Sequence, residues 1–526
     1  QLHTGFSIAA LASEVFLRSP EGCVADYVDV GRLYADISFG RTESGAWEYF
    51  LAPTPAAENT TESRPGFSAT PLLDPPGGFY EAAEVSISGA QVRYTLDGAV
   101  PTSQSEAYGA PLDLEAGLQP VVVRAVAFEE GLWPSRVATS TYFEDLSLIE
   151  SDVRIISLTA EPDDLFDPQT GIYEFGPDYE RAYPHFGANF WELWERDVHV
   201  EYFEAGGERL FSQDAGIQIA GGYSRAFDQR NFELIARSGY GPEIFAGQVF
   251  DDEEISSFTR LYLRNGGDWC GTQLVDGIVQ SLFRGEDGSR NPHADLPAYE
   301  PALVYINGEF WGLYEVKERL DESYAAAHHG ADPDALDRVK VGWTHDANWE
   351  LEQGTWAAFD ELEALRVGAD LSQAAEWEAF DALVDLTNFA TIQAAQGWIG
   401  NTDWWYNNIR MWRPTPDGEF RWMGYDFGHG YTSANYDHLG PTVVGSWPAL
   451  PVADALENDA FRALFVNVHA DFLNTSFRAE SAAANVDELA AEVRPVMAMQ
   501  RDRWCGGASM PAWEDSVAYA RDFASQ

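Results

Sequence analysis

Three polar residues in the C-terminal half of the chain have types and spacing that suit chemistry on phosphate groups. Asp403 is followed five positions later by Asn408, and an Asp-Phe-Gly tripeptide begins at Asp426. A carboxylate can face an attacking hydroxyl, while a second carboxylate and an amide oxygen hold Mg²⁺ against phosphates. The sequence therefore predicts a metal and phosphate site built around these three residues.

Local patterns predict the elements that must position this site. Apolar residues at helical spacing predict one helix over 377–398, which delivers the chain to Asp403. Two strands, 409–412 and 420–423, flank a turn-forming Pro-Thr-Pro-Asp-Gly run and lead to Asp426. A protein-kinase C-terminal lobe uses the same order of helix, loop with Asp and Asn, hairpin and Asp-Phe-Gly. This order favours phosphoryl transfer.

The same three residues also have ordinary structural interpretations. Asp403 could cap a helix, Asn408 could lie in a turn, and Asp426 could bind a structural Ca²⁺. Spacing alone does not remove these alternatives.

Composition limits the class of protein. With 526 residues, 45% of them hydrophobic, the chain can form several packed domains. No run of about 18 apolar residues occurs, so no membrane-spanning helix is predicted. The 85 acidic and 32 basic residues give a net charge of −53, which disfavours nucleic-acid binding. A solvated acidic shell is one explanation of this charge, and a basic protein partner is another.

Lysine and cysteine usage constrains the chemistry further. Lys317 and Lys340 are the only lysines, so a catalytic lysine is one of these two or arginine has taken its role. Cys23, Cys270 and Cys505 have no metal-binding spacing. A disulfide between Cys270 and Cys505 in an exported protein, and a buried free thiol, are alternatives that stay open.

Residues 1–60 predict a first all-β module of short strands and turns. A Leu-His-Thr-Gly-Phe run at 2–6, an Asp-Ile-Ser-Phe-Gly-Arg run at 36–41, Pro53 and Asn59 resemble the second half of a lamin-tail domain. That family has a small β-sandwich fold. Because the resemblance covers only the closing strands, we expect the sequence to begin inside this domain.

After a polar linker, residues 67–145 predict a second all-β module with strands at 92–96 and 121–127. The Tyr-Thr-Leu-Asp-Gly run at 94–98, Tyr108 and the later Thr-Tyr pair resemble the immunoglobulin-like module at the C-terminus of chitobiases. In that family the module is accessory, so no catalytic residue is assigned to it.

From about residue 146 the pattern is mixed α and β, and its motifs resemble the CotH family in content and order. These motifs are Leu-Phe-Asp-Pro at 165–168, Trp-Glu-Arg at 194–196, Gly-Gly-Tyr-Ser-Arg at 221–225, Leu-Arg-Asn-Gly at 263–266, Tyr-Ile-Asn-Gly-Glu at 305–309 and the 403–428 block. The family is named for spore-coat proteins and has a divergent protein-kinase fold. The resemblance implies a two-lobed α+β kinase-like domain over 146–510.

The resemblance also implies activity and location. Active members transfer phosphate from ATP to serines of coat or secreted proteins, so we expect ATP with Mg²⁺ or Mn²⁺ as cofactors. Asp403 would be the catalytic carboxylate, and Asn408 and Asp426 would be metal ligands. A secreted or cell-surface bacterial protein is expected, with a protein substrate that is basic and serine-rich.

One departure concerns the cation that contacts the ATP phosphates. Where the family has lysine, this sequence has Arg230, which keeps the charge but is a planar fork. Lys317 is the second candidate, although an exposed strand-end lysine is the simpler interpretation. We expect Arg225 to reach a phosphate and Glu318 to contact nucleotide or pair with an arginine. Asp276, in a helix-like segment over 273–283, could orient Arg230.

Two functions follow from these patterns. The first is an atypical kinase that phosphorylates Ser or Thr of an extracellular or coat protein. The alternative is a catalytically silent pseudokinase that serves adhesion at the cell surface, with β-modules that contact a wall polymer. A carbohydrate-active enzyme is set aside because no carboxylate pair stands out in the chitobiase-like module.

Overall fold

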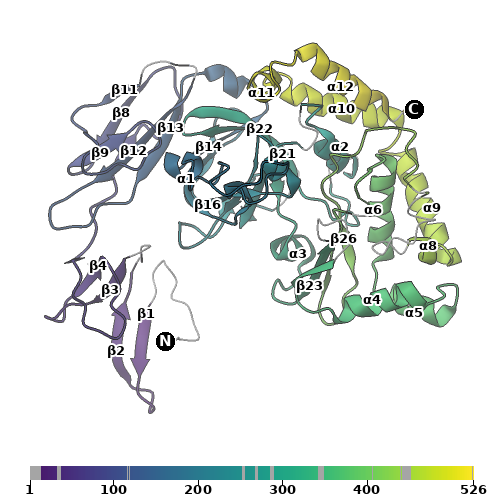
Figure 1. Ribbon diagram of the computed structural model, residues 1–526, viewed down its shortest axis with the longest axis horizontal. Helices are drawn as coiled ribbons and strands as arrows, with labels where there is room; N and C mark the ends of the chain where they lie inside the picture. The colour runs from purple at the N-terminus through teal and green to yellow at the C-terminus, as the bar shows by residue number, and fades with distance from the viewer. Residues whose placement is uncertain are drawn as a thin grey trace.

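The computed structural model of this chain places two β-modules, a β-barrel and a helical part from left to right (Figure 1). It describes residues 14–31, 33, 37–114, 117, 119–251, 255–266, 270–284, 289–341, 349–404, 407–438, 440, 452–523 and 525. The run at 2–6 that contributes to the lamin-tail resemblance lies outside these residues. Within the described ranges, no helix has the length and apolar character needed to cross a membrane.

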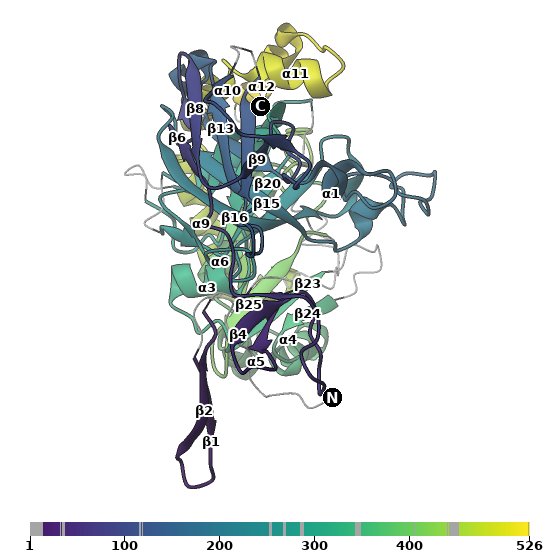
Figure 2. The ribbon, with the colours of Figure 1, turned by 90° about the vertical axis from the view of Figure 1, so that its left-hand side faces the viewer.

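The first module consists of a hairpin and a small sheet. Strands β1 (Glu14–Arg18) and β2 (Val24–Asp29) pair antiparallel and extend away from the rest of the chain (Figure 2). The three-stranded sheet has the order β3-β4-β5 and consists of β3 (Ser38–Arg41), β4 (Trp47–Phe50) and β5 (Ser63–Arg64). These elements agree with the all-β prediction, while the lamin-tail assignment stays a prediction.

The second module is a β-sandwich of two sheets. One has the order β10-β9-β12-β13-β7 and the other β11-β8-β6. Their strands are β6 (Leu72–Asp74), β7 (Gly78–Phe79), β8 (Ala83–Ser88), β9 (Val92–Thr95), β10 (Glu106–Ala107), β11 (Leu112–Leu114), β12 (Val121–Ala127) and β13 (Ala138–Phe143). Side chains of β8 alternate between buried and exposed, as expected of a strand with one face on the core. The predicted strands at 92–96 and 121–127 are confirmed.

This second module is packed against the barrel that follows it. The ring of Phe143 lies 5.6 Å from that of Phe203 and 5.3 Å from that of Tyr305, both of which belong to the barrel. The backbone N–H of Thr141 donates to Glu201 at 2.6 Å, and Glu201 is buried. Phe143 therefore joins a hydrophobic cluster that includes these barrel residues, while β8, β9 and β12 of the module enclose a core of their own.

The barrel contains seven strands in the closed order β14-β15-β16-β17-β20-β22-β21. They are β14 (Arg154–Thr159), β15 (Arg196–Phe203), β16 (Arg209–Ala220), β17 (Asn231–Ile235), β20 (Arg260–Arg264), β21 (Tyr299–Ile306) and β22 (Glu309–Glu318). The parallel pairing of β14 with β21 closes the sheet. The predicted mixed α and β content is present, but this part of the domain is a closed barrel, a feature that the sequence did not predict. The two-lobed kinase-like fold stays a prediction.

Several short helices and strands lie in the loops around the barrel. They are η1 (Leu146–Glu150), α1 (Pro162–Phe166), η2 (Asn189–Trp191), η3 (Tyr223–Ala226), and the paired strands β18 (Phe245–Ala246) and β19 (Ser257–Phe258). Helix α2 (Val275–Leu282) packs beside β21 and fits the helix-like segment predicted over 273–283.

A four-stranded sheet in the order β24-β23-β25-β26 follows the barrel. It consists of β23 (Leu336–Val341), β24 (Trp349–Gln353), β25 (Arg410–Pro414) and β26 (Arg421–Met423), and is preceded by α3 (Glu322–His329). The predicted hairpin is thus confirmed as β25 and β26, which pair antiparallel.

Helix α6 (Leu386–Trp398) packs on β26, and α4 (Ala357–Gly368) packs on β24 through Phe359 and Trp349. Helix α5 (Ala374–Asp381) contacts α4. The prediction of one helix over 377–398 is wrong, because α5 and α6 are separated by a turn. The Asp385 carboxylate accepts the N–H groups of Thr387 and Asn388 and so begins a new helix.

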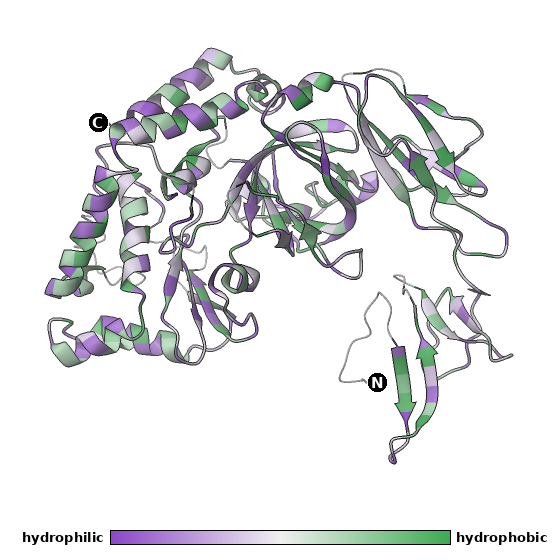
Figure 3. Cartoon of the chain, turned by 180° about the vertical axis from the view of Figure 1, so that it is seen from behind, coloured by the Kyte–Doolittle hydropathy of each residue, from purple (hydrophilic) through white to green (hydrophobic). Residues whose placement is uncertain are grey.

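The C-terminal helices are α8 (Val452–Ala455), α9 (Asp459–Asn474), α10 (Ala479–Val493), α11 (Met497–Trp504) and α12 (Met510–Phe523). Green and purple residues alternate along them, as expected of helices with one apolar face (Figure 3). Because α12 ends at Phe523 and packs on the core, the helical part continues past the predicted boundary at 510. Cys270 and Cys505 form a disulfide, whereas Cys23 is free and exposed.

Candidate active site

A cleft of about 470 Å³ lies between the barrel and the four-stranded sheet. Its barrel side includes the turn at 221–225 and residues of β20 and β22. Its other side includes Asn408 and Asp426, two of the three residues predicted to form the site. The third, Asp403, does not line the cleft but is hydrogen-bonded to Asn408, so the three residues are neighbours.

Asp403 is positioned by a chain of amide side chains at the end of α6. Gln396 of α6 accepts a hydrogen bond from the buried Asn401 at 2.8 Å, and Asn401 in turn accepts the backbone N–H of Asp403 at 3.0 Å. The amides of Asn407 and Asn408 both donate to Oδ2 of Asp403 at 3.0 Å. The carboxylate is therefore held by one of its two oxygens.

Asn408 and Asp426 have backbone conformations that favour particular residue types. Both have a φ of 57°, in the left-handed region that asparagine and aspartate enter more readily than most residues. Such backbone conformations cost energy and persist only where the surrounding structure holds them, and they are frequent at functional sites. The Asp-Phe-Gly turn is fixed further by Phe427, whose side chain is fully buried.

The cation opposite Asp426 is Arg264, the last residue of β20. One guanidinium nitrogen of Arg264 binds Asp426 and another binds Asp276 of α2. Arg264 is 8% exposed, and its carboxylate neighbours raise the pKa of the guanidinium despite burial. The expected cation opposite Asn408 and Asp426 is therefore Arg264, a residue that the sequence had not singled out.

Asp276 is the centre of this charge cluster. Its carboxylate binds Arg264 and Lys317 and also accepts the backbone N–H of Phe427 at 2.8 Å. Burial alone would raise the pKa of Asp276, but the two cations outweigh it and lower the pKa. Asp276 therefore stays ionised and joins α2, the barrel and the Asp-Phe-Gly turn.

Lys317 lies in the cleft and is not the exposed strand-end lysine of the simpler interpretation. It is 3% exposed, binds Asp276, and lies 3.0 Å from Oε2 of Glu315. Burial raises the pKa of Glu315 although Lys317 opposes the shift. Lys317 is thus a second cation at the same end of the cleft as Arg264.

Arg230 does not occupy the predicted position, and the expectation that it faces the phosphates is corrected here. Its guanidinium donates to the carbonyls of Tyr173, Arg225 and Phe227 at 2.6–3.0 Å and lies 3.8 Å from the ring centre of Phe190. It does not line the cleft. A buried arginine that satisfies three carbonyls stabilises the fold, and Asp276 therefore orients Arg264 and Lys317 in its place.

Arg225 lines the cleft beside Gly221 and Gly222. Its Nε donates to the Gly221 carbonyl at 2.7 Å and its Nη1 to the Phe190 carbonyl at 3.2 Å. Gly221 has a φ of 105°, which side chains rarely adopt, so the turn needs glycine there. Arg225 therefore braces this turn while staying at the cleft wall.

Glu318 ends β22 and also lines the cleft. Its Oε1 lies 2.7 Å from Nε2 of His328, and its Oε2 lies 3.6 Å from Arg290. The two alternatives, contact with nucleotide and pairing with an arginine, are thus both compatible with its position.

The cleft carries a charge opposite to that of the whole chain. Its cationic side chains are Arg225, Arg260, Arg264, Lys317, Arg319, Lys340 and Arg410, and its carboxylates are Glu233, Asp276, Glu318 and Asp426. Cations outnumber carboxylates here although the net charge is −53, and both lysines of the chain contribute. Glu315 and Glu352 pair with Lys317 and Arg410 behind the wall, so the excess of cations at the wall is partly offset. The remaining excess favours an anion such as a nucleoside triphosphate.

The donor atoms suit a divalent cation that prefers oxygen. The Asn408 amide nitrogen binds Asp403, which leaves its carbonyl oxygen as a ligand, and the Asp426 side chain is 39% exposed. Within the described ranges, no group of three His, Cys, Asp or Glu residues could hold a metal. Mg²⁺ commonly uses one or two protein ligands together with substrate phosphates, so the pair fits this metal.

Sequence reasoning missed Arg264, Asn407 and Glu315. Arg264 belongs to the Leu-Arg-Asn-Gly motif, and its place at the end of a strand just before the α2 segment was an available signal. Asn407 directly precedes Asn408, so its place was visible locally, whereas Glu315 reaches the site only through the closure of the barrel.

The arrangement is that of a mixed α/β domain with a cationic, metal-compatible cleft next to a barrel. A family model described as CotH kinase protein matches residues 217–526, well over half of the chain. The chain therefore belongs to the CotH kinase protein family. A second model, the chitobiase/beta-hexosaminidase C-terminal domain, matches residues 75–139, in agreement with the second β-module. No curated protein matches the chain.

Proposed function

We propose that this protein is an exported or cell-surface kinase that transfers phosphate from ATP to serine or threonine of another protein. One observation carries the proposal: Asn408, which is hydrogen-bonded to Asp403, and Asp426 line one cleft that Arg264 and Lys317 face from the barrel. Family membership supports the same activity, and the disulfide suits an oxidising compartment.

Each residue of the site has a separate role in the proposed reaction. Arg264, Lys317 and Arg225 would bind the phosphates, and Asn408 and Asp426 would hold Mg²⁺ or Mn²⁺, which neutralises phosphate charge when bound. Asp403 would orient the serine hydroxyl and accept its proton as the oxygen attacks the γ-phosphorus. The bond from that phosphorus to the bridging oxygen breaks, and ADP leaves.

The alternative is a pseudokinase that serves adhesion. The replacement of the expected lysine by Arg230 motivates it, but Arg230 lies outside the cleft, where Arg264 and Lys317 supply the cations instead. The alternative predicts nucleotide binding at most, without transfer.

The direct test uses the oxidised full chain, labelled ATP and Mg²⁺ or Mn²⁺. The acceptors are a synthetic serine- and arginine-rich peptide and its serine-to-alanine counterpart. We expect label on the serine peptide and on neither the alanine peptide nor samples treated with a chelator. Equal incorporation by wild type and Asp426→Asn would refute the kinase, and binding of ATP without any transfer would favour the pseudokinase.

A further inference from the structure

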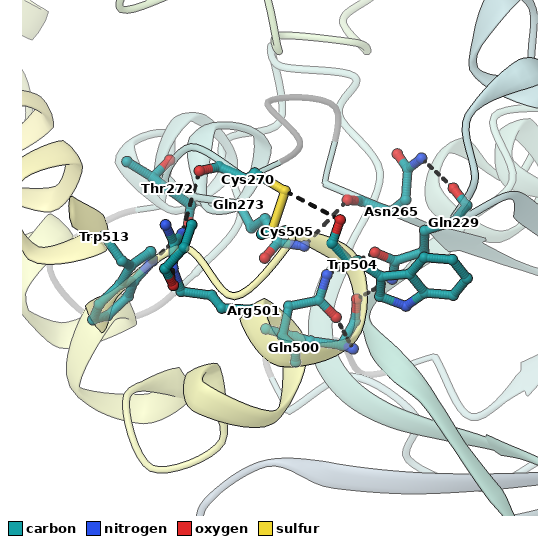
Figure 4. The surroundings of a disulfide bond; sticks show 12 residues. Gln229, Asn265, Cys270, Thr272, Gln273, Gln500, Arg501, Trp504, Cys505 and Trp513 are labelled. Atoms are coloured by element: carbon teal, nitrogen blue, oxygen red, sulfur yellow. Dashed lines mark hydrogen bonds between the residues drawn. A yellow bond between two sulfur atoms is a disulfide. The ribbon is translucent and has the colours of Figure 1, made fainter. Parts of the chain in front are cut away.

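A disulfide links the C-terminal helices to the segment that positions Asp276, the partner of Arg264 and Lys317. The Cys270–Cys505 disulfide joins residues 235 positions apart (Figure 4). Cys270 lies between Arg264, the last residue of β20, and Asp276, in the first turn of α2. Cys505 directly follows α11. The bridge thus connects the C-terminal part to the short connection between the two charged partners.

Hydrogen bonds reinforce the bridge where α2 begins. Arg501 of α11 donates to the Cys270 carbonyl at 3.2 Å, and the buried Trp513 of α12 donates to the Thr272 carbonyl at 3.0 Å. Thr272 in turn accepts the backbone N–H of Leu274, which precedes the helix, at 3.2 Å. The entry to α2 is therefore held from the C-terminal side.

Helix α10 contacts the other end of α2, where Asn485 donates to Ser281 at 2.7 Å. Helix α2 spans only Val275–Leu282, and helices this short have little stability of their own in water. Its position depends on these surrounding contacts.

A second path leads from α11 to the glycine-rich turn. Gln500 donates to the side chain of Gln229 at 2.6 Å, and the Gln229 carbonyl accepts the Asn265 amide at 2.7 Å. The Asn265 backbone N–H donates to Asn231 at 2.8 Å, and Asn231 donates to Ser224 in the turn at 2.9 Å. All four amide side chains are at most 1% exposed, so this network is rigid.

We propose that the disulfide-fastened helices α11 and α12 are a positioning element for phosphoryl transfer. They hold α2 so that Asp276 keeps Arg264 and Lys317 directed at the phosphate end of the cleft. Reduction of the bridge therefore switches the site to a low-activity state. This inference rests on the proposed kinase function.

The switching step is a thiol–disulfide exchange. Formation of the S–S bond removes two electrons and two protons from the Cys270 and Cys505 thiols and passes them to an oxidised disulfide partner. Dithiothreitol reverses the step: it supplies the two electrons and two protons and becomes its own cyclic disulfide. The protein would thus gain full activity only in an oxidising compartment.

The test compares oxidised, dithiothreitol-reduced and re-oxidised full chain, together with the Cys270→Ser/Cys505→Ser double variant. Kinetic constants for ATP are measured at a temperature where circular dichroism shows all forms folded. We expect reduction to lower kcat/KM about 10-fold to 100-fold, as expected for misplaced catalytic groups, with recovery on re-oxidation. Hydrogen exchange of the α2 amides should accelerate in the reduced form.

Two further variants separate positioning from general stability. Trp513→Phe keeps the disulfide and the packing but loses the bond to Thr272, so it should raise KM for ATP and lower kcat. Cys23→Ser removes the exposed cysteine outside this region and should behave as wild type. Unchanged kcat and KM in a reduced, folded and otherwise active protein would overturn the inference. An oxidised protein that neither binds ATP nor transfers phosphate would instead overturn the proposed function.

Discussion

Arg264 and Asp426 form an ion pair that connects the barrel to the Asp-Phe-Gly turn although 162 positions separate them in the chain. Asp276 binds the same guanidinium from α2, so one arginine joins three elements. This pair places a fixed positive charge beside a residue assigned to metal binding. The proposed kinase chemistry depends on this relationship.

Substitution Asp426→Asn should weaken binding of ATP in the presence of Mg²⁺ much more than in its absence. The amide keeps the size of the side chain but removes the charge that attracts both the metal and Arg264. Calorimetry at matched Mg²⁺ concentrations measures the difference. Asp417→Asn, in the exposed turn between β25 and β26, is the matched control and should bind like wild type. Equal metal dependence in both variants would speak against Asp426 as a ligand.

Substitution of Arg264 should lower activity, whereas substitution of Arg230 should lower stability. Arg264→Met removes a charge from the cleft and should lower kcat/KM about 10²-fold to 10³-fold, as loss of an electrostatic stabiliser does. Arg264→Lys should recover part of the loss, because the charge remains. Arg230→Lys should lower the free energy of unfolding by about 1–3 kcal/mol while ATP affinity is kept, since its bonds are to buried carbonyls. A large loss of ATP affinity in Arg230→Lys would restore the original prediction.

Stability should fall as the pH rises from about 4.3 to about 8. Glu204, Asp251 and Glu300 surround the single guanidinium of Arg154. Burial raises the pKa of Glu300 to about 8 and that of Glu492 to about 7, although Arg154 opposes both shifts. An acid with a raised folded pKa binds its proton more tightly when folded. Its contribution is complete below the unfolded pKa of about 4.3 and is lost as the pH passes the folded value.

Thermal unfolding across this pH range checks the expectation. Glu300→Gln should flatten the dependence of Tm on pH, because the amide cannot ionise. Glu243→Gln changes an exposed carboxylate and should leave the slope as in wild type. A slope that Glu300→Gln does not alter would contradict the assignment.

The second β-module should unfold together with the barrel. Phe143→Ala removes a ring that packs against Phe203 and Tyr305 and should cost about 3–5 kcal/mol. Calorimetry should show that the transition containing the barrel shifts to lower temperature. Leu72→Ala, at an exposed position of the same module, is the control. A shifted module transition beside an unchanged barrel transition would show that the two are energetically separate.

The sequence identified Asp403, Asn408 and Asp426, and also Lys317 and Arg225 as candidates on the phosphate side, but it did not identify Arg264. Asp403, Asn408 and Asp426 lie within one segment, so their spacing and the hairpin between them were visible locally. The pairing of Arg264 with Asp276 depends on where β20 and α2 meet, which helical or strand periodicity does not report. Arg230 was wrongly predicted to bind phosphate because it follows a glycine-rich turn. In the structure, aromatic rings and carbonyls hold it away from the cleft.

For the fold, too, the local elements were predictable and the long-range contacts were not. Alternation identified the β-modules and the β25–β26 hairpin. Closure of the barrel depends on the parallel pairing of β14 with β21, strands far apart in the chain, and no local pattern signals it. The break before α6 depends on the capping bonds of Asp385, whose neighbours continue the helical apolar spacing on both sides.

The most direct test of the central claim is single-turnover transfer from labelled ATP by wild type and Asp403→Asn. Both proteins are oxidised and saturated with ATP and Mg²⁺, and the serine- and arginine-rich peptide is the acceptor. The account predicts similar ATP affinity but transfer about 10²-fold to 10⁴-fold slower in Asp403→Asn, because the variant cannot accept the hydroxyl proton. Equal transfer rates in the two proteins would contradict it.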